Sequence, residues 1–244
     1  MTSPMTSLMN PTTPGTTPGT TPGTTPDIRL VVLDMAGTTV ADGGLVEEAF
    51  AAAARHLGAE PADMLDYVRA TMGESKISVF RHLFGEEAKA QDANKAFEAA
   101  YADLVDGGRV AALPGARETI ETLKSQGRTV VLTTGFARTT QDAILAALGW
   151  QDLADLTLCP ADAGGRGRPY PDMVLTAFLR TAVADDVRQV AVVGDTSYDM
   201  LSGVRAGAGL VAGVLTGAHG ADALRVAGAG QVLDGVGQLP GVLA

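Results

Sequence analysis

The chain has little of what a secreted or membrane-embedded protein needs. Cys159 is its single cysteine, so no internal disulfide can form, which favours a reducing compartment. No apolar run approaches the roughly 20 residues that a membrane-spanning helix requires. The start of the chain lacks the basic residues and the continuous apolar stretch of a signal peptide. We therefore expect a soluble cytoplasmic protein without a membrane partner.

Basic residues are also scarce. The 18 lysines and arginines stand against 28 aspartates and glutamates, which gives a formal net charge of −10 at pH 7. A chain this acidic repels the phosphate backbone of nucleic acids and the head groups of anionic lipids. We therefore expect no nucleic-acid partner.

Residues 1–26 contain no charged side chain and repeat the unit TTPG from Thr12 onward. A proline at every fourth position is incompatible with a helix, and the segment lacks the alternation of a strand. We predict a disordered tail here. Residues 27–244 are enough for one sizeable domain, or for a core that carries an insertion.

Short apolar runs rich in branched residues alternate with helical patterns through most of the remaining chain. Such runs are typical of strands buried on both faces of a parallel sheet. The alternation predicts a doubly wound, Rossmann-like α/β sheet, which binds its ligands at the carboxyl ends of the strands. The predicted strands are Ile28–Leu33, Thr129–Leu132, Val190–Val193 and Leu210–Leu215, and the predicted helices are Ala116–Ser125, Thr139–Leu148, Met173–Ala182 and Met200–Arg205. The Gly/Ala-rich stretch from Gly207 to the end is interpreted as closing strands.

One stretch interrupts this alternation. Residues 45–112 show helical patterns punctuated by glycines and no convincing strand. We predict an all-helical cap inserted after the first strand, with residues 27–44 and 113–244 forming the α/β core. The predicted cap helices are Leu45–Leu57, Pro61–Ala70, Lys76–Phe84 and Glu86–Asp106.

Polar side chains follow the predicted strands. Asp34 opens the segment DMAGTTV directly after the first strand, where Gly37 allows a tight turn and Thr38 adds a hydroxyl group. An aspartate in this place can also merely cap a turn. Its position at the ligand edge of the sheet makes it a candidate functional group.

Further polar groups are expected at the same edge. Thr134 and Gly135 follow the second strand, Asp195 and Asp199 follow a later one, and Arg168 lies in a loop before a helix. Carboxylates gathered at one place repel one another unless a hard cation lies between them, and magnesium prefers oxygen ligands. The pattern therefore predicts a Mg²⁺ site.

This set of residues resembles the four motifs of the haloacid dehalogenase superfamily. The resemblance implies that Asp34 is a nucleophile that forms an aspartyl-phosphate and that Thr134 holds a phosphoryl oxygen. Arg168 would balance negative charge where most members use lysine. A carboxylate nucleophile combined with a metal and a cation is coherent chemistry for phosphoryl transfer. The implied magnesium ligands are Asp34, the Ala36 carbonyl, Asp195 and Asp199.

Ala36 departs from the phosphatases of that superfamily, most of which have an aspartate two residues after the nucleophile to protonate the departing alkoxide. A methyl group donates no proton, and the loss of a general acid typically costs about 10²–10⁴ in rate. The sequence therefore predicts either a poor phosphatase or a leaving group that needs no acid there.

Lys76, in the segment MGESK, favours the second possibility. Most lysines are merely solvated surface residues, but MGESK together with DMAGT resembles the phosphonatases (phosphonoacetaldehyde hydrolases). By that resemblance Lys76 forms an iminium with the carbonyl group of the substrate. The iminium accepts the electrons of the broken carbon–phosphorus bond, so no alkoxide forms. We also expect Gly37, Thr38, Gly135 and Met72 to contact the substrate.

The polar groups that phosphonatases keep around this lysine are replaced here by Val79, Phe136 and Gly44. His82 lies further along the helix, and we interpret it as structural or exposed. We therefore favour a Mg²⁺-dependent hydrolase acting on phosphonoacetaldehyde or another 2-oxoalkylphosphonate. The alternatives are a phosphomonoesterase, similar to phosphoglycolate phosphatases, and a non-catalytic binding module. Phosphonatases pair through their caps, which implies a homodimer.

Overall fold

The computed structural model describes residues 27–244, and the predicted disordered tail over residues 1–26 lies outside them. Six parallel strands form the central sheet in the order β5-β4-β1-β6-β7-β8. Their bounds are β1 Leu30–Asp34, β4 Thr129–Thr133, β5 Leu156–Leu158, β6 Val190–Gly194, β7 Leu210–Val214 and β8 Gln231–Leu233. The predicted α/β class with a doubly wound parallel sheet is confirmed.

The central strand β1 explains why the sheet is covered on both faces. All five of its residues are buried, as expected for a strand with helices on either side. Val31 and Leu33 belong to a cluster that includes Ile120 of α5, whereas Leu30 and Val32 pack with a separate cluster beneath α7. Successive side chains of a strand point to opposite faces, so one apolar run fills two layers.

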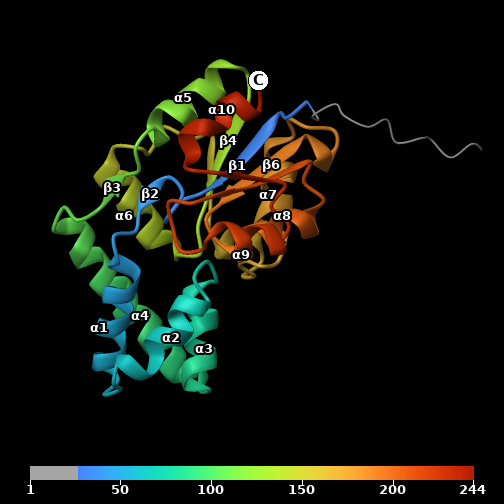
Figure 1. Ribbon diagram of the computed structural model, residues 1–244. Helices are drawn as coiled ribbons and strands as arrows, with labels where there is room; N and C mark the ends of the chain where they lie inside the picture. The colour runs from blue at the N-terminus through green and yellow to red at the C-terminus, as the bar shows by residue number, and fades with distance from the viewer. Residues whose placement is uncertain (1–26) are drawn as a thin grey trace, which may run out of the picture.

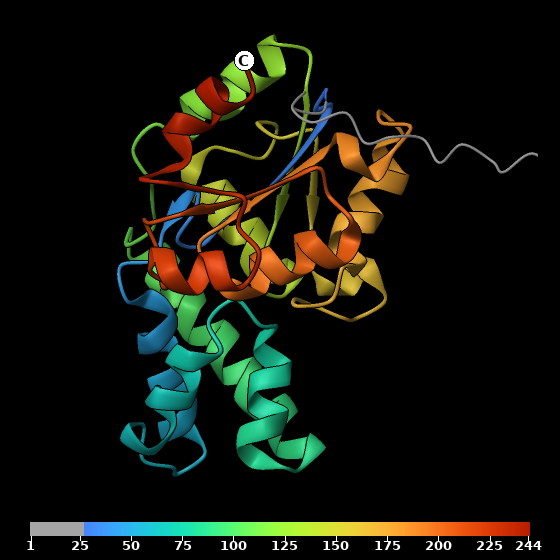
Figure 2. The same ribbon diagram turned by 45° about the vertical axis from the view of Figure 1, so that its right-hand side comes forward.

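The helices of the sheet domain lie on its two faces in Figures 1 and 2. Helices α5 and α10 lie together on one side, whereas α7 and α8 lie on the other. Their bounds are α5 Ala116–Ser125, α6 Arg138–Leu148, α7 Asp172–Thr181, α8 Ser197–Ala206, α9 Ala221–Val226 and α10 Leu239–Val242.

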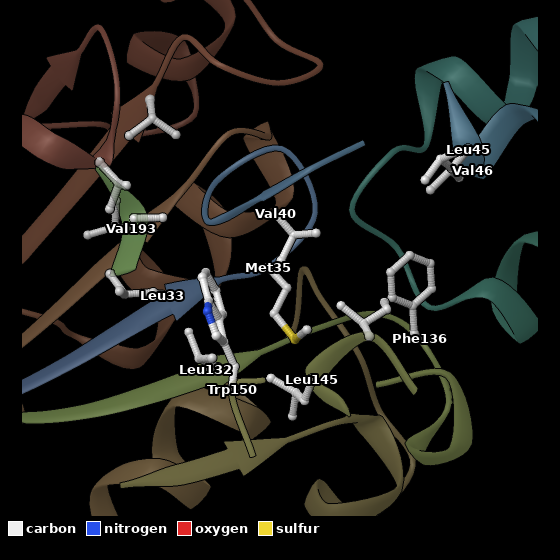
Figure 3. Close-up of a cluster of buried hydrophobic side chains, with 14 of the residues drawn as sticks. Leu33, Met35, Val40, Leu45, Val46, Leu132, Phe136, Leu145, Trp150 and Val193 are labelled. Carbon is white, nitrogen blue, oxygen red and sulfur yellow. The ribbon is translucent and has the colours of Figure 1, made fainter. Parts of the chain in front are cut away.

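Four further helices, which we call the cap helices, form a separate group next to the sheet (Figure 1). They are α1 Leu45–His56, α2 Ala62–Ala70, α3 Lys76–Phe84 and α4 Glu87–Asp106. Aromatic side chains hold them together: Phe50 of α1 packs against Phe80 of α3 and Phe97 of α4, with ring centroids 4.7 and 4.9 Å away. Figure 3 shows Phe136 of the sheet domain extending toward Leu45 and Val46 of α1.

A short antiparallel pair joins the two groups of elements. Strand β2, Val40–Ala41, pairs with β3, Ala111–Ala112, so the chain leaves the sheet domain and returns to it side by side. The expectation that residues 45–112 contain no strand is therefore wrong at β3. Two exposed alanines have neither the length nor the alternation that identifies a strand in a sequence.

Other differences concern the ends of elements and the C-terminal region. Strand β5 has only three residues and was not predicted. Helix α8 begins at Ser197 rather than Met200, because the Thr196 side chain accepts the Asp199 N–H and caps it. The interpretation of everything after Gly207 as strands is correct for β7 and β8 and wrong for α9 and α10. These two helices are short and lie in a stretch rich in alanine and glycine, so no helical periodicity could be recognised. Among residues 27–244, no helix combines the length and apolar character needed to cross a bilayer.

Candidate active site

The sheet order brings the predicted polar residues to one edge. Asp34 is the last residue of β1 and pairs in register with Thr133, the last residue of β4. On the other side of β1, strand β6 ends at Gly194, directly before Asp195. Strands β4 and β6 both flank β1, so their carboxyl ends lie side by side, where doubly wound sheets bind ligands.

Three buried carboxylates meet at this edge. One oxygen each of Asp34, Asp195 and Asp199 lies within 4.8 Å of the others. Burial raises the pKa of Asp34 well above its usual range; Arg168 opposes this, and repulsion from Asp199 and Asp195 adds to it. Burial likewise raises the pKa of Asp195. Such a site favours a bound cation.

Arg168 is the cation that already lies in this cluster. Its guanidinium group contacts Asp34 and Asp199, at 2.7 Å in each case, and also donates to the Thr133 hydroxyl at 2.7 Å. When all three carboxylates are ionised, as metal ligands are, the guanidinium leaves two negative charges, which matches a divalent ion. An all-oxygen donor set of this kind suits Mg²⁺. The residues present therefore fit the predicted magnesium site.

Two of the predicted site residues, Thr38 and Asp199, do not line the cavity described below. The Thr38 side chain is fully buried and donates to Asp195 Oδ1 at 3.2 Å, so it supports a carboxylate and does not face the cavity described below. Asp199 is also withdrawn, because its Oδ2 accepts from the Thr196 hydroxyl and N–H at 2.5 and 3.1 Å.

Gly37 occupies the turn after β1 for a steric reason. Its φ is +86°, a backbone conformation that residues other than glycine rarely adopt. A Cβ at this position would lie 2.5 Å from Asp195 Oδ2. The close approach of the turn to the carboxylate therefore requires glycine.

The cap helices contribute Lys76, the first residue of α3. Its side chain is only 7% exposed, and Nζ lies 5.3 Å from the ring centroid of Phe136 and 5.8 Å from that of Phe50. Burial lowers the pKa of this amine to about 8. The negative charges of Asp42 and Asp34 oppose this effect, because they raise the pKa of Lys76. A lysine in this environment is partly neutral near pH 8 and can act as a nucleophile.

A loop of the cap rests directly on the sheet domain and brings Lys76 to the strand ends. A Cβ on Gly135 would lie 2.7 Å from the Glu74 carbonyl oxygen, and one on Gly73 would lie 2.4 Å from the Thr196 hydroxyl. The Lys76 backbone N–H donates to the Gly135 carbonyl at 3.4 Å. The absence of side chains at these two glycines permits the contact.

Lys76 and Asp34 line a single cavity of about 440 Å³ between the cap and the sheet domain. Ala36, in the place of a general acid, also lines it, and its methyl group cannot supply a proton. Thr134 faces the cavity, and its hydroxyl accepts the Phe136 N–H at 3.2 Å. The predicted site residues that this cavity brings together are Asp34, Ala36, Gly37, Met72, Lys76, Thr134, Gly135, Arg168 and Asp195.

Several cavity residues were not predicted. Thr216, Gly217 and Ala218 follow the carboxyl end of β7, so the strand-end rule could have identified them. No pattern marks the charged residues among the others, Asp42, Glu47 and Arg69, because they come from one loop and two separate helices. His82 stacks on Tyr67 at 4.2 Å and does not line this cavity, which agrees with its interpretation as structural or exposed.

Comparison with known proteins gives a consistent assignment. The family model described as haloacid dehalogenase-like hydrolase matches residues 28–207. A probable phosphatase, IndB, of Dickeya dadantii is 30% identical over 87% of this chain and 92% of its own length. A phosphonoacetaldehyde hydrolase of Bacillus cytotoxicus is 30% identical over 78% of this chain and 76% of its own.

The solved structures agree with these relatives. A phosphonoacetaldehyde hydrolase-like protein from Oleispira antarctica superposes with a TM-score of 0.77 at 25% identity, covering 90% of this chain and 92% of that one. A hydrolase from Pseudomonas syringae gives the same TM-score at 24% identity, over 88% of this chain and 97% of that one, which supports the fold. The chain therefore belongs to the haloacid dehalogenase-like hydrolase family and has phosphonatase-like relatives.

Proposed function

We propose that this hydrolase cleaves the carbon–phosphorus bond of a 2-oxoalkylphosphonate, phosphonoacetaldehyde or a relative, with Mg²⁺ as its cofactor. The observation that carries the proposal is the burial of the Lys76 amine in the same cavity as Asp34. A solvated surface lysine would be exposed and would keep its ordinary pKa, whereas this one is buried with a lowered pKa.

The two groups divide the reaction between them. Lys76 condenses with the carbonyl carbon of the substrate, and the resulting iminium accepts the electron pair of the carbon–phosphorus bond as an enamine. Asp34 attacks phosphorus from the strand edge and forms an aspartyl-phosphate, which water then hydrolyses. Because the leaving group is an enamine carbon, no alkoxide has to be protonated at Ala36.

The other residues hold the phosphoryl group in place. Arg168, 2.7 Å from Asp34, balances the charge of the nucleophile and of the group it receives. The Thr134 side chain and the Gly135 backbone provide polar contacts beside it. Asp34, the Ala36 carbonyl, Asp195 and Asp199 would hold Mg²⁺, which when bound neutralises negative charge on the phosphoryl oxygens.

A borohydride experiment tests this proposal. Incubation with phosphonoacetaldehyde and borohydride is expected to reduce the iminium and label Lys76, while the same substrate releases phosphate in the presence of Mg²⁺. The Lys76→Arg variant is expected to give neither label nor phosphate, because a guanidinium does not form the imine. Phosphate release by the native enzyme with no lysine labelled would remove the imine from the mechanism.

A phosphomonoesterase is the second candidate, because the IndB relative that covers 87% of this chain is named a phosphatase. It predicts rapid hydrolysis of small phosphate esters such as phosphoglycolate and little effect of Lys76→Arg. A phosphate-release screen of 2-oxoalkylphosphonates against phosphate esters, with magnesium and with chelator, separates the two. Equal loss of all activity in Asp34→Asn is expected in either case and would exclude the binding module.

A further inference from the structure

Lys76 needs a proton acceptor before it can attack a carbonyl group, and the positions that are polar in phosphonatases cannot supply one here. Phe136 presents its ring to the amine, and Val79 is buried and apolar. Gly44 precedes α1 and has no side chain. A different group must therefore serve this lysine if the proposed function holds.

We propose that the carboxylate of Asp42 is the proton-transfer group for Lys76, a role that rests on the proposed function. Asp42 lies in the loop between β2 and α1, two residues before Gly44, and lines the same cavity as Lys76 and Asp34. The Val46 N–H donates to its Oδ1 at 3.2 Å and fixes the side chain at the start of α1.

Each of the other carboxylates of the cavity is paired with an arginine or belongs to the acidic cluster that would hold Mg²⁺. Asp34 pairs with Arg168 at 2.7 Å, and Glu47 accepts from Arg69 at 2.9 and 2.8 Å. Asp195 accepts from the Ala218 N–H at 2.8 Å and from the Thr38 hydroxyl at 3.2 Å. Over residues 27–244, neither Asp42 nor Lys76 forms an ion pair within 4.0 Å, so the amine and the carboxylate do not touch, and a proton passes between them through a water molecule in the cavity.

The electrostatics of the two groups are complementary. Among the charged groups that act on the amine, Asp42 raises the pKa of Lys76 most, ahead of Asp34. Burial raises the pKa of Asp42, and Lys76 is the cation that lowers it. Burial thus moves the two pKa values toward each other, which lowers the free energy needed to pass a proton between them.

Other titratable and charged groups face this pair. Arg168 and Asp195 also act on Lys76 from the sheet domain, and Glu47 of α1 acts on Asp42. Tyr101 of α4 is fully buried, and Asp42 contributes to the rise in its pKa. The phenol of Tyr101 has no hydrogen-bond partner among residues 27–244. Because its pKa is raised, the phenol stays protonated near neutral pH and does not take the proton of Lys76.

Two protons leave nitrogen when the imine forms. The Lys76 ammonium passes the first to the Asp42 carboxylate through a water molecule, and the neutral amine forms the carbon–nitrogen bond with the carbonyl carbon of the substrate. Asp42 returns that proton to the former carbonyl oxygen, which takes a second proton from nitrogen and leaves as water. The ammonium and the carbonyl group thereby give an iminium and one water, and Asp42 is again a carboxylate. After the carbon–phosphorus bond breaks, the enamine carbon takes a proton from water and becomes an iminium again. Hydrolysis of this iminium reverses the transfers above and frees Lys76.

The test compares borohydride labelling of Lys76 in the native enzyme, Asp42→Asn and Asp42→Glu, with phosphonoacetaldehyde as the probe. In Asp42→Asn the amide oxygen of the new side chain can still accept the Val46 N–H, so the thermal midpoint of that variant is expected to stay unchanged. Its labelling rate at pH 7 is expected to fall by about 10²-fold or more, as for loss of a general acid–base group. Rising pH is expected to restore part of the rate, because hydroxide can then deprotonate the amine.

Two controls make the outcome decisive. Asp42→Glu keeps a carboxylate, so it is expected to label within about tenfold of the native rate. Glu48→Gln, on α1 but outside the cavity and paired with Arg109, is expected to leave labelling unchanged. Equal labelling of the native enzyme and Asp42→Asn would overturn the role of Asp42 alone. A native enzyme that releases phosphate without any label would overturn the proposed function, and this role with it.

Discussion

At the scale of single residues, Lys76 is placed where a charge is unfavourable. Its amine lies between two aromatic rings, which offset part of the lost hydration, yet burial still lowers its pKa from an ordinary value of 10.5 to about 8. Burial of the charged Lys76 ammonium therefore destabilises the native fold, although the proposed chemistry uses the neutral amine. This cost gives the residue a measurable thermodynamic signature.

We predict that Lys76→Met stabilises the protein at pH 7. Below about pH 8 both folded and unfolded states hold the proton, and the folded state bears the full cost of the buried charge, about 3 kcal/mol for a shift of this size. Between pH 8 and 10.5 only the unfolded state keeps the proton, so the stability of the native protein rises with pH. Thermal unfolding should show the variant several degrees more stable at pH 7, with the difference gone near pH 11. A less stable variant at pH 7 would contradict this.

Ala36 offers a second test at this scale, because its methyl group lines the cavity beside Asp34. Ala36→Asp introduces the proton donor that an alkoxide leaving group needs. We predict that hydrolysis of small phosphate esters rises at least tenfold, part of the roughly 10²–10⁴-fold that a general acid typically contributes. Phosphonate cleavage should not rise, because an enamine needs no acid at that place. Steady-state rates with both substrate classes check the prediction, and Ala36→Asn, of similar size but without the proton, serves as the control.

At the scale of elements, the contact between the cap loop and the strand ends decides whether Lys76 can reach Asp34. Gly135 and Gly73 permit this contact because any side chain there would meet the opposite backbone or Thr196. The cap loop rests on the strand ends at Gly135, and Phe136 packs against Phe97 and Tyr101 of α4, so both contacts help to position the cap helices.

We predict that Gly135→Ala displaces the cap loop, because its methyl group would lie 2.7 Å from the Glu74 carbonyl oxygen. Labelling of Lys76 and kcat/KM for the phosphonate should fall at least tenfold. Hydrogen exchange of the Lys76 amide, which donates to the Gly135 carbonyl, should accelerate. Gly241→Ala, at a site in α10 with no atom of another residue within 4 Å of the added methyl group, should change none of these three quantities. Unaltered exchange at Lys76 in Gly135→Ala would show that the loop tolerates the methyl group.

At the scale of the whole molecule, three buried carboxylates at one edge of the sheet leave an excess of negative charge in the folded state. Mg²⁺ that binds only the folded state should therefore raise the thermal midpoint. At a free Mg²⁺ concentration of 100 times the dissociation constant, the free energy of unfolding should increase by about 2.7 kcal/mol. We predict that Asp195→Asn weakens this stabilisation and that chelator abolishes phosphate release. Calorimetric scans with and without Mg²⁺ check the first part, and a midpoint that does not respond in the native protein would contradict it.

The homodimer through the cap stays a prediction at this scale. Sedimentation velocity at several concentrations is expected to show a dimer, and charged substitutions on the outer faces of the cap helices should dissociate it. A monomer at all concentrations would contradict the prediction.

From the amino-acid pattern alone we could predict the α/β class, the strand-end positions of Asp34 and Asp195, and the start of α3 at Lys76. Short-range patterns carry that information, because the side chains of a strand or helix repeat along the chain. The packing of the folded chain, in contrast, places Asp42, Glu47 and Arg69 along the cavity and leaves Thr38 and Asp199 outside it. It also decided the burial of Lys76, because that depends on Phe50, Phe136 and a glycine contact from separate segments. No local pattern records which distant segments come together.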